Sequence, residues 1–503
     1  MPLQTIAEKS GYRATSTHAE VMAYIEGLAQ LHSPLLHVTS FGQTPQGREL
    51  PLLVLSSEGV ADPAAARALG RPVVLLQNCI HAGEVEGKES ALMLVRDLLT
   101  GPDQGLLEKL TVVVLPIFNA DGNDAMDTAN RALHIERLTG QDGPPRVGTR
   151  VNAAGINLNR DYMKHETHEM RLLQTRVCQR WEPDLSVDSH ATNGSVHRFS
   201  MTHDIPHTVA SGRSEPIDFM RHTLVPEISA AVKKSFGLDS GWYGNFVEDE
   251  RALDQRGTAD ATAAVAEGWL TYPHNPRFGS NYRGLTNRLD LLLECYSYIS
   301  FEERVRTTYA WLLETLRAAA GRADEIRELL ARSRMPPARV AVGYAIEAMA
   351  EPIDVLTREP RTRTGEPRTV RLPFLARFVG TRVVDRPRAY VLPGHLAAFL
   401  RGHGLRVEDA PAQATVEVPR FEGFSEHDAR AILEASSVGQ CTVSWSRDSR
   451  TLPPGSIVVP TEQPLGAVAV YLGEPESDDG LVANGLVPPP AVGQEFPILR
   501  VVE

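Results

Sequence analysis

The sequence has few cysteines, and none of them lies in a motif typical of a disulfide framework or of a zinc site built from cysteines. Its four cysteines, Cys79, Cys178, Cys295 and Cys441, are widely spaced and form no C-x-x-C pair. This pattern indicates neither a disulfide framework nor a zinc site built from cysteines, and it suits a reducing compartment.

The sequence also lacks long apolar runs and an excess of basic residues. The formal net charge is -12, which argues against broad binding to nucleic acids or anionic membranes, because both need basic surfaces. No apolar run reaches the length of a membrane span, and residues 1–11 lack the apolar segment of a signal peptide. We therefore expect a cytoplasmic protein with no nucleic-acid or membrane partner, although a chain trimmed of a signal peptide would show the same pattern.

The length and a linker-like segment predict two domains. A chain of 503 residues exceeds what one hydrophobic core usually holds. The segment 332–337 ends in two prolines and is typical of a linker. We therefore expect a catalytic domain over residues 1–335 and an accessory domain over residues 336–503.

Predicted helices and strands alternate through residues 1–335. Apolar runs predict strands at 35–40, 50–55, 73–76, 111–115, 185–188 and 289–294, and helical periodicity predicts helices at 17–28, around 92–99, at 170–181, at 216–236 and from 300 to 316. This alternation predicts an α/β fold with a mixed, largely parallel twisted sheet flanked by helices. In such sheets, functional sites gather at the carboxyl ends of the strands.

Shorter, proline-bounded segments follow the linker. Strands are predicted at 339–342, 390–393, 414–418, 456–460, 468–472 and 496–502, with helices at 395–403 and 429–437. We expect a smaller, mixed or β-rich C-terminal domain. The acidic stretch 474–480 has cation-binding residue types, but the simpler interpretation is a solvated turn.

A candidate metal-binding pair follows the predicted strand 73–76. His81 and Glu84 lie three residues apart on a turn that leaves this strand, so their side chains can converge on one cation. They would supply two of the three protein ligands that a catalytic zinc ion needs. The pair alone is a weak signal, so its meaning depends on the rest of the chain.

Polar motifs at the other strand ends occur in a recognisable order. After His81 and Glu84 come Asn119-Ala-Asp121-Gly122, Arg150, Gly155-Ile-Asn157-Leu-Asn159-Arg160, His190 and Glu294. Over roughly residues 12–330, this ordered set resembles the zinc metallocarboxypeptidases of the carboxypeptidase A type. The H-A-G-E sequence and the short spacing from Arg150 to Asn159 are similar to the cytosolic carboxypeptidase branch. The resemblance implies a carboxypeptidase-like fold for residues 1–335.

The resemblance assigns the metal site and the base. His81, Glu84 and His190 would hold one Zn²⁺ per chain and leave a fourth position open. Glu294 would act as general base. A buried carboxylate after the apolar run 291–293 would be costly without such a role.

The resemblance also assigns substrate-binding residues. Arg150 would stabilise the oxyanion of the reaction, although Arg131 and Arg137 lie in the same connecting segment and a surface salt bridge is an arginine's usual fate. Asn159 and Arg160 would bind the terminal carboxylate of the substrate, for which a planar fork of donors is suited.

The loop before Glu294 should cap the substrate and line its side-chain pocket. Either Tyr272 or Tyr282 would be the capping tyrosine. Arg277 and Arg283 permit a preference for acidic or polar terminal residues, and the simpler alternative is that both arginines face solvent.

Two features depart from the family pattern or compete with it. Asn157 stands where the family usually has an aspartate that orients a zinc histidine, and Asp188 is a candidate for such a role. The His-rich segment 164–169 lacks H-E-x-x-H spacing, so we interpret it as the solvated start of a helix. We expect His197, His203 and His207 in loops near the rim of the site.

The favoured function is that of a zinc-dependent metallocarboxypeptidase, which hydrolyses C-terminal peptide bonds through a metal-activated water. One alternative is a zinc amidase or deacylase that acts on small N-acyl amino acids or cell-wall peptides. Another is a non-catalytic binding protein, against which the presence of both Glu294 and Arg150 argues. The expected partner is a peptide or small amide, and the sequence leaves the oligomeric state open.

Overall fold

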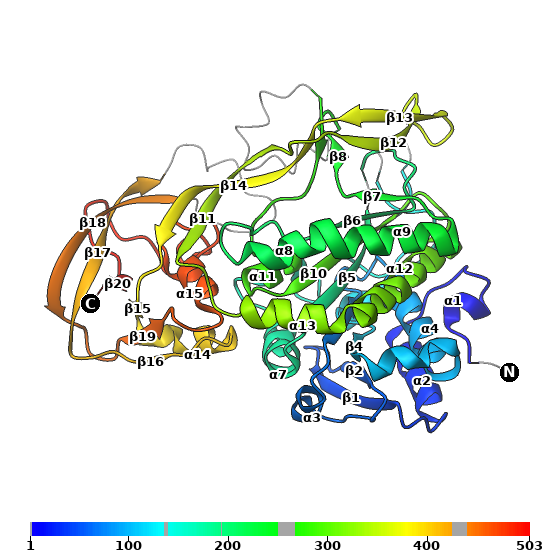
Figure 1. The fold of residues 1–503 in the computed structure, drawn as a ribbon, viewed down its shortest axis with the longest axis horizontal. Helices are drawn as coiled ribbons and strands as arrows, with labels where there is room; N and C mark the ends of the chain where they lie inside the picture. The colour runs from blue at the N-terminus through cyan, green and yellow to red at the C-terminus, as the bar shows by residue number, and fades with distance from the viewer. Residues whose placement is uncertain (1–2, 135–138, 193, 250–266, 425–439, 503) are drawn as a thin grey trace.

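The centre of the protein is an eight-stranded sheet (Figure 1). The computed structural model describes residues 3–134, 139–192, 194–249, 267–424 and 440–502. In spatial order the strands are β1 (Leu36–Gln43), β2 (Glu49–Leu55), β4 (Thr111–Leu115), β3 (Val73–Asn78), β5 (Leu185–Thr192), β10 (Leu289–Tyr296), β6 (Met201–Asp204) and β7 (Ser240–Trp242).

The four central strands of this sheet, β4, β3, β5 and β10, run parallel. The pairs β1–β2, β2–β4 and β10–β6 are antiparallel. Every residue of β3 is buried, as expected for a parallel strand covered on both faces. The prediction of a mixed, largely parallel sheet is therefore confirmed, and the parallel strands share one carboxyl edge.

Helices cover the sheet. The long helices α4 (Glu86–Thr100), α12 (Phe301–Gly321) and α9 (Val225–Phe236) lie side by side (Figure 1). Capping boxes at Thr17 and Ser300 begin α2 (His18–Ala29) and α12, as the sequence predicted. The other helices are α1 (Ile6–Lys9), α3 (Pro63–Ala68), α5 (Ala120–Asp124), α6 (His168–Leu172), α7 (Gln179–Trp181), α8 (Ser214–Phe219), α11 (Gly279–Leu285), α13 (Ala323–Arg332), α14 (Ala397–Gly402) and α15 (Gly466–Gly473).

None of the helices in the described residues combines the length and the apolar composition that a bilayer crossing needs. The predicted cytoplasmic location stays a prediction.

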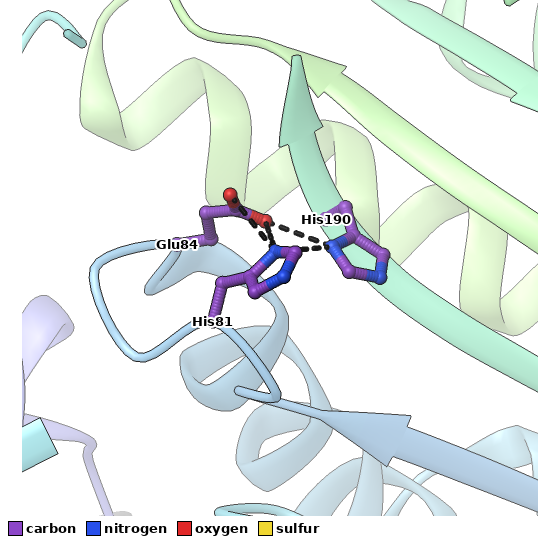
Figure 2. Close-up of side chains that lie close together, drawn as sticks. All are labelled: His81, Glu84 and His190. Atoms are coloured by element: carbon purple, nitrogen blue, oxygen red, sulfur yellow. Dashed lines mark hydrogen bonds and ion pairs between the residues drawn. The ribbon is translucent and has the colours of Figure 1, made fainter. Parts of the chain in front are cut away.

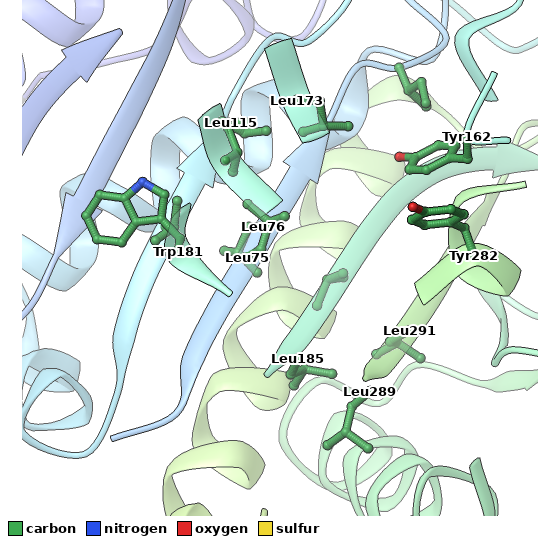
Figure 3. Close-up of a cluster of buried hydrophobic side chains, with 14 of the residues drawn as sticks. Leu75, Leu76, Leu115, Tyr162, Leu173, Trp181, Leu185, Tyr282, Leu289 and Leu291 are labelled. Carbon is green, nitrogen blue, oxygen red and sulfur yellow. The ribbon is translucent and has the colours of Figure 1, made fainter. Parts of the chain in front are cut away.

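Leucines from the central strands form the core beneath the helices. Figure 3 shows Leu75, Leu76, Leu115, Leu185 and Leu291 in one buried cluster with aromatic side chains from the connecting segments. Each fully buried side chain of this size stabilises the fold by about 1.5–3 kcal/mol relative to an exposed one. This core fixes the strand ends that carry the polar motifs.

The C-terminal part, residues 336–503, is β-rich, as predicted. One sheet contains β11 (Arg339–Ala348), β14 (Phe374–Asp385), β9 (Trp269–Leu270) and β8 (Asn245–Phe246), and β12 (Ile353–Glu359) pairs with β13 (Glu366–Leu372). A second sheet contains β16 (Glu408–Asp409), β19 (Ile457–Pro460), β15 (Ala389–Leu392), β20 (Leu499–Val501), β17 (Gln413–Phe424) and β18 (Cys441–Thr451). Because β9 pairs with β14, backbone pairing crosses the proposed boundary between residues 335 and 336. The division into two domains stays a prediction.

Two local predictions for the C-terminal part are wrong. Residues 468–472 form the helix α15 rather than a strand, and every residue of α15 is buried. A short run that is apolar on all sides carries no periodicity to separate a helix from a strand. The acidic stretch is not a solvated turn, because Glu474 and Asp479 are fully buried. The predicted helix at 429–437 lies outside the described residues.

Candidate metal centre

The carboxyl ends of β3 and β5 bring His81, Glu84 and His190 together (Figure 2). After β3 the chain turns at Cys79, whose φ of 64° is unusual for a non-glycine residue. The backbone N–H of Glu84 then donates to the His81 carbonyl at 2.9 Å, which places these two side chains next to each other. His190 lies on the adjacent strand β5, and at most 4% of each of the three residues is exposed.

The potential ligand atoms of these residues converge. His190 Nδ1 lies 2.9 Å from Glu84 Oε2 and 3.1 Å from His81 Nδ1. His81 Nδ1 lies 3.3 Å from Glu84 Oε2. Two imidazole nitrogens and one carboxylate oxygen form a donor set that suits a zinc ion with one position left open. Within the described residues, no other group of histidine, cysteine or acidic side chains converges in this way.

The far nitrogens of both histidines are also bonded. His81 Nε2–H donates to Asn157 Oδ1 at 3.0 Å, and His190 Nε2 lies 3.4 Å from Asp188 Oδ2. An acceptor at Nε2 holds a proton there, so Nδ1 is the nitrogen that faces the cluster and that would offer its lone pair to a cation. Asn157 therefore contacts His81, the histidine that the aspartate of the family pattern would orient. Asp188 contacts His190.

The electrostatics of the cluster favour a charged carboxylate. Burial opposes ionisation of Glu84, but His81 and Arg131 hold its pKa well below the usual value. Burial and the positive charge of Arg150 lower the pKa of His81 to about 3, which keeps this imidazole neutral. Burial also disfavours the charged form of His190, yet Asp188 and Glu84 raise its pKa well above the usual value.

Two arginines hold the other oxygen of Glu84. Arg150 Nη1 lies 3.4 Å from Glu84 Oε1 and 3.1 Å from His81 Nδ1, and the Arg150 side chain is 40% exposed. Arg131 Nη1 donates to the same Oε1 at 3.0 Å. Neither Arg131 nor Arg150 is thus confined to a surface salt bridge. Arg137 lies outside the described residues.

Arg131 is a site residue to which the sequence gave no role. It also donates to the carbonyl of Ala191 and to the hydroxyl of Ser297, so it joins the ends of β5 and β10. A Cβ added at Gly83 would lie 2.7 Å from Arg131 Cδ. The glycine within H-A-G-E leaves the room that Arg131 occupies, and no local sequence signal marks Arg131 as its neighbour.

Glu294 lies beside His190 in the sheet. β10 and β5 pair in parallel with Glu294 opposite His190, so both side chains project from the same face. Burial raises the pKa of Glu294 to about 7, although the charge of His190 opposes this shift. A carboxylate that titrates near neutral pH is suited to accept and return a proton.

Asn159 and Arg160 lie next to this cluster on a short 3₁₀-helix, Leu158–Arg160. Asn159 Nδ2 lies 3.5 Å from His190 Nε2, and Asn159 Oδ1 accepts from the backbone N–H of Gly279 at 2.9 Å. The guanidinium of Arg160 lies 3.9 Å from the centre of the Phe278 ring. The two residues are therefore held between the candidate metal ligands and the loop before β10.

The hydroxyl groups of the two candidate capping tyrosines are bonded in the interior. The Tyr272 hydroxyl donates to the Ile205 carbonyl at 2.9 Å, and the Tyr282 hydroxyl lies 2.7 Å from His403 Nδ1. Both tyrosines are buried, so a capping role for either one stays a prediction.

The arginines of the loop before β10 are neither solvent-facing nor unpaired. Arg277 pairs with Asp479 at 2.9 Å and Arg283 with Asp290 at 2.8 Å, and all four side chains are largely buried. The solvent-facing interpretation is therefore wrong, and a preference for acidic or polar terminal residues stays a prediction.

Two expectations about the other histidines are also wrong. His197, His203 and His207 are buried rather than placed at a loop rim, and His203 lies within β6. In the segment 164–169, Glu166 and His168 are exposed, but His165 is buried and stacks on His403.

The chain is similar in sequence to known carboxypeptidases. Residues 21–208 match the family model described as "Zinc carboxypeptidase". "Carboxypeptidase 2" of Trichophyton tonsurans is 23% identical over 505 aligned residues, which cover 96% of this chain and 86% of that protein. "Carboxypeptidase D" of Mus musculus is 31% identical over 142 residues, covering 25% of this chain and 10% of that protein. A solved metallo-carboxypeptidase from Burkholderia cenocepacia superposes with a TM-score of 0.40 at 19% identity, covering 61% of this chain and 70% of that one.

Proposed function

Through residues 21–208 the chain belongs to the zinc carboxypeptidase family, and from this premise we propose that it releases single residues from the carboxyl ends of peptides. The resemblance expected from the sequence is confirmed by the family match, as is the prediction of a zinc metallopeptidase. The observation that carries the proposal is the convergence of His81, Glu84 and His190 beside Glu294. The family match includes the three candidate ligands and ends before Glu294.

His81 and His190 would bind one zinc ion through Nδ1, and Glu84 would bind it through Oε2. Bound zinc would polarise the scissile carbonyl and make a water acidic enough to lose its proton near neutral pH. Asn157 and Asp188 keep the protons of the histidines on Nε2. Arg131 and Arg150 hold the second oxygen of Glu84, Oε1, by contacts of 3.0 and 3.4 Å.

The remaining residues handle the proton and the substrate. Glu294 takes the proton of the attacking water and passes it to the leaving amine. Arg150 is half exposed beside His81, where its charge stabilises the negative oxygen that forms on the carbonyl carbon. Asn159 and Arg160 bind the terminal carboxylate of the peptide, so the bond that reaches the metal is the last one of the chain.

The test is mass spectrometry of a mixed peptide pool after incubation with the zinc-loaded protein, with a chelated sample as control. We expect loss of single C-terminal residues in the zinc sample alone. Bound zinc is measured in parallel, and one ion per chain is the expected content. An untouched pool from a protein that holds its zinc would contradict the proposal and favour an amidase of small N-acyl compounds.

A further inference from the structure

The loop of residues 273–279 connects the C-terminal part to the candidate carboxylate-binding residues. The side chain of Asp479, which belongs to the C-terminal part, holds this loop at Arg277. The backbone N–H of Arg277 donates to Asp479 Oδ2 at 2.7 Å, and its guanidinium Nε and Nη2 lie 3.1 and 2.9 Å from Oδ1. Asp479 is fully buried and Arg277 is 11% exposed, so this ion pair is shielded from solvent.

A second residue of the loop is held by the same region. His274 Nε2 lies 2.7 Å from Asp478 Oδ2. The His274 ring lies 4.5 Å from the ring of Tyr344 and 5.4 Å from that of Phe378, on β11 and β14. The C-terminal part thus holds the 273–279 loop by the Arg277–Asp479 ion pair and, at His274, by the 2.7 Å contact with Asp478 and by aromatic packing.

The other side of the 273–279 loop contacts the candidate carboxylate-binding residues. Phe278 packs under the guanidinium of Arg160, and Gly279 donates its backbone N–H to Asn159. A Cβ at Gly279 would lie 2.9 Å from the Tyr162 ring, so the backbone fits closely against the domain core. Phe278 and Gly279 follow Arg277 directly, and a shift of Arg277 therefore reaches both contacts.

We propose that Asp479 is a positioning residue for substrate recognition, acting through Arg277 on Asn159 and Arg160. The proposal rests on the function proposed above, in which Asn159 and Arg160 bind the terminal carboxylate. In this view, the C-terminal part completes the substrate site. Removing the Asp479 charge takes the ion-pair partner away from a buried guanidinium, and we expect Arg277 to relieve this cost by moving the loop.

The test compares Asp479→Asn with Glu474→Gln. Glu474 is a matched control because it is also fully buried and pairs with an arginine, Arg500, and it forms no hydrogen bond or ion pair with the described residues of the 273–279 loop. With the best peptide from the pool as substrate, we expect Asp479→Asn to raise KM about tenfold and to change kcat less than about twofold. The zinc content should stay at the wild-type value. Glu474→Gln should leave KM at its wild-type value.

Hydrogen exchange supplies a measurement that needs no turnover. Asp479→Asn should speed exchange in peptides that cover residues 273–283, whereas Glu474→Gln should not. If Asp479→Asn fails to fold, Arg277→Gln breaks the same pair from the loop side and should raise KM similarly.

Each outcome decides a separate question. An active wild type whose KM and loop exchange are unmoved by both Asp479→Asn and Arg277→Gln overturns the positioning role alone. Equal KM increases in Asp479→Asn and Glu474→Gln would also overturn it, because they would indicate a general loss of structure. A wild type that releases no residue from any peptide contradicts the proposed function itself.

Discussion

Glu84 and Asp479 are both buried carboxylates, yet their surroundings differ. Glu84 lies within 3.4 Å of two histidines and two arginines. Asp479 has one cationic partner, Arg277, and its remaining bonds come from neutral groups. A one-to-one pair satisfies both charges and leaves no capacity for a ligand. A carboxylate crowded by several donors is held in one orientation and still offers an oxygen that a metal ion can take.

The C-terminal part repeats the one-to-one arrangement. Glu474 is matched by Arg500, with Oε1 2.8 Å from Nε. Asp478 is matched by His274. We therefore expect a buried carboxylate with one strong cationic partner to have a structural role. A buried carboxylate with several basic partners is a candidate for a functional role.

Among the variants that test this comparison, Glu294→Gln should have the largest effect on kcat/KM. Loss of the general base should lower kcat/KM by about 10²–10⁴-fold. Zinc binding should be unchanged because the ligands remain. Steady-state kinetics and metal analysis check both statements, and turnover at the wild-type rate would remove Glu294 from the mechanism.

A smaller effect is expected from Asp188→Asn. This change removes the charge that faces His190 Nε2 and should weaken zinc binding by about 10–100-fold. Competition with a chromophoric chelator measures the affinity, and Asp479→Asn serves as the buried-aspartate control. Equal zinc affinity in the wild type and Asp188→Asn would show that Asp188 has no part in orienting the ligand.

Asp204 tests a third arrangement, a buried carboxylate that forms no ion pair with a lysine or arginine of the described residues. Its nearest basic group is His207 at 3.6 Å, whose pKa is held well below the usual value by burial and Arg221. Burial raises the pKa of Asp204 to about 7, although the charge of Arg221 and the hydrogen bond from Thr271 act to lower it.

The folded state therefore binds a proton that the unfolded state releases at about pH 4. The stability that this proton contributes is complete below that pH and is lost as the pH rises through about 7. We expect Asp204→Asn to raise Tm by a few degrees at pH 8 and to flatten the change in Tm between pH 5 and 8. A parallel pH profile in wild type and variant would contradict this assignment.

The smallest effect on activity is expected from Tyr282→Phe. Its hydroxyl contacts His403 in the interior, so its loss should cost about 1–3 kcal/mol of unfolding free energy and change kcat/KM less than about twofold. Denaturant unfolding and kinetics measure the two quantities, and Tyr272→Phe is the matched comparison. A fall in kcat/KM that exceeds the effect of Arg150→Lys would make Tyr282 the capping residue.

Local sequence signals predicted most of the central fold and the metal cluster. The capping boxes at Thr17 and Ser300 lie within four residues of the helices they begin. The strand 73–76 and the turn to Glu84 lie within one short segment, so spacing alone could place His81 beside Glu84. The order of the motifs then predicted the partner His190, because parallel strands end at one edge.

Contacts between distant segments could not be predicted in this way. Arg277 and Asp479 are one pairing among 51 basic and 63 acidic residues, and no local pattern marks them as partners. Arg131 is positioned by the space above Gly83, which depends on the folded backbone. The strand β14 was missed, and α15 was misassigned because its buried sequence lacks periodicity.

The pairing of β9 with β14 has a consequence for how the protein is made. Trp269 is fully buried, and its strand obtains its parallel partner only when Phe374 is in place. During synthesis, domains fold from the N-terminus onward as they leave the ribosome. Here β9 has only β8 as a partner until more than a hundred further residues have emerged. A chain interrupted in that interval leaves one edge of β9 unpaired, and an unpaired strand edge favours aggregation.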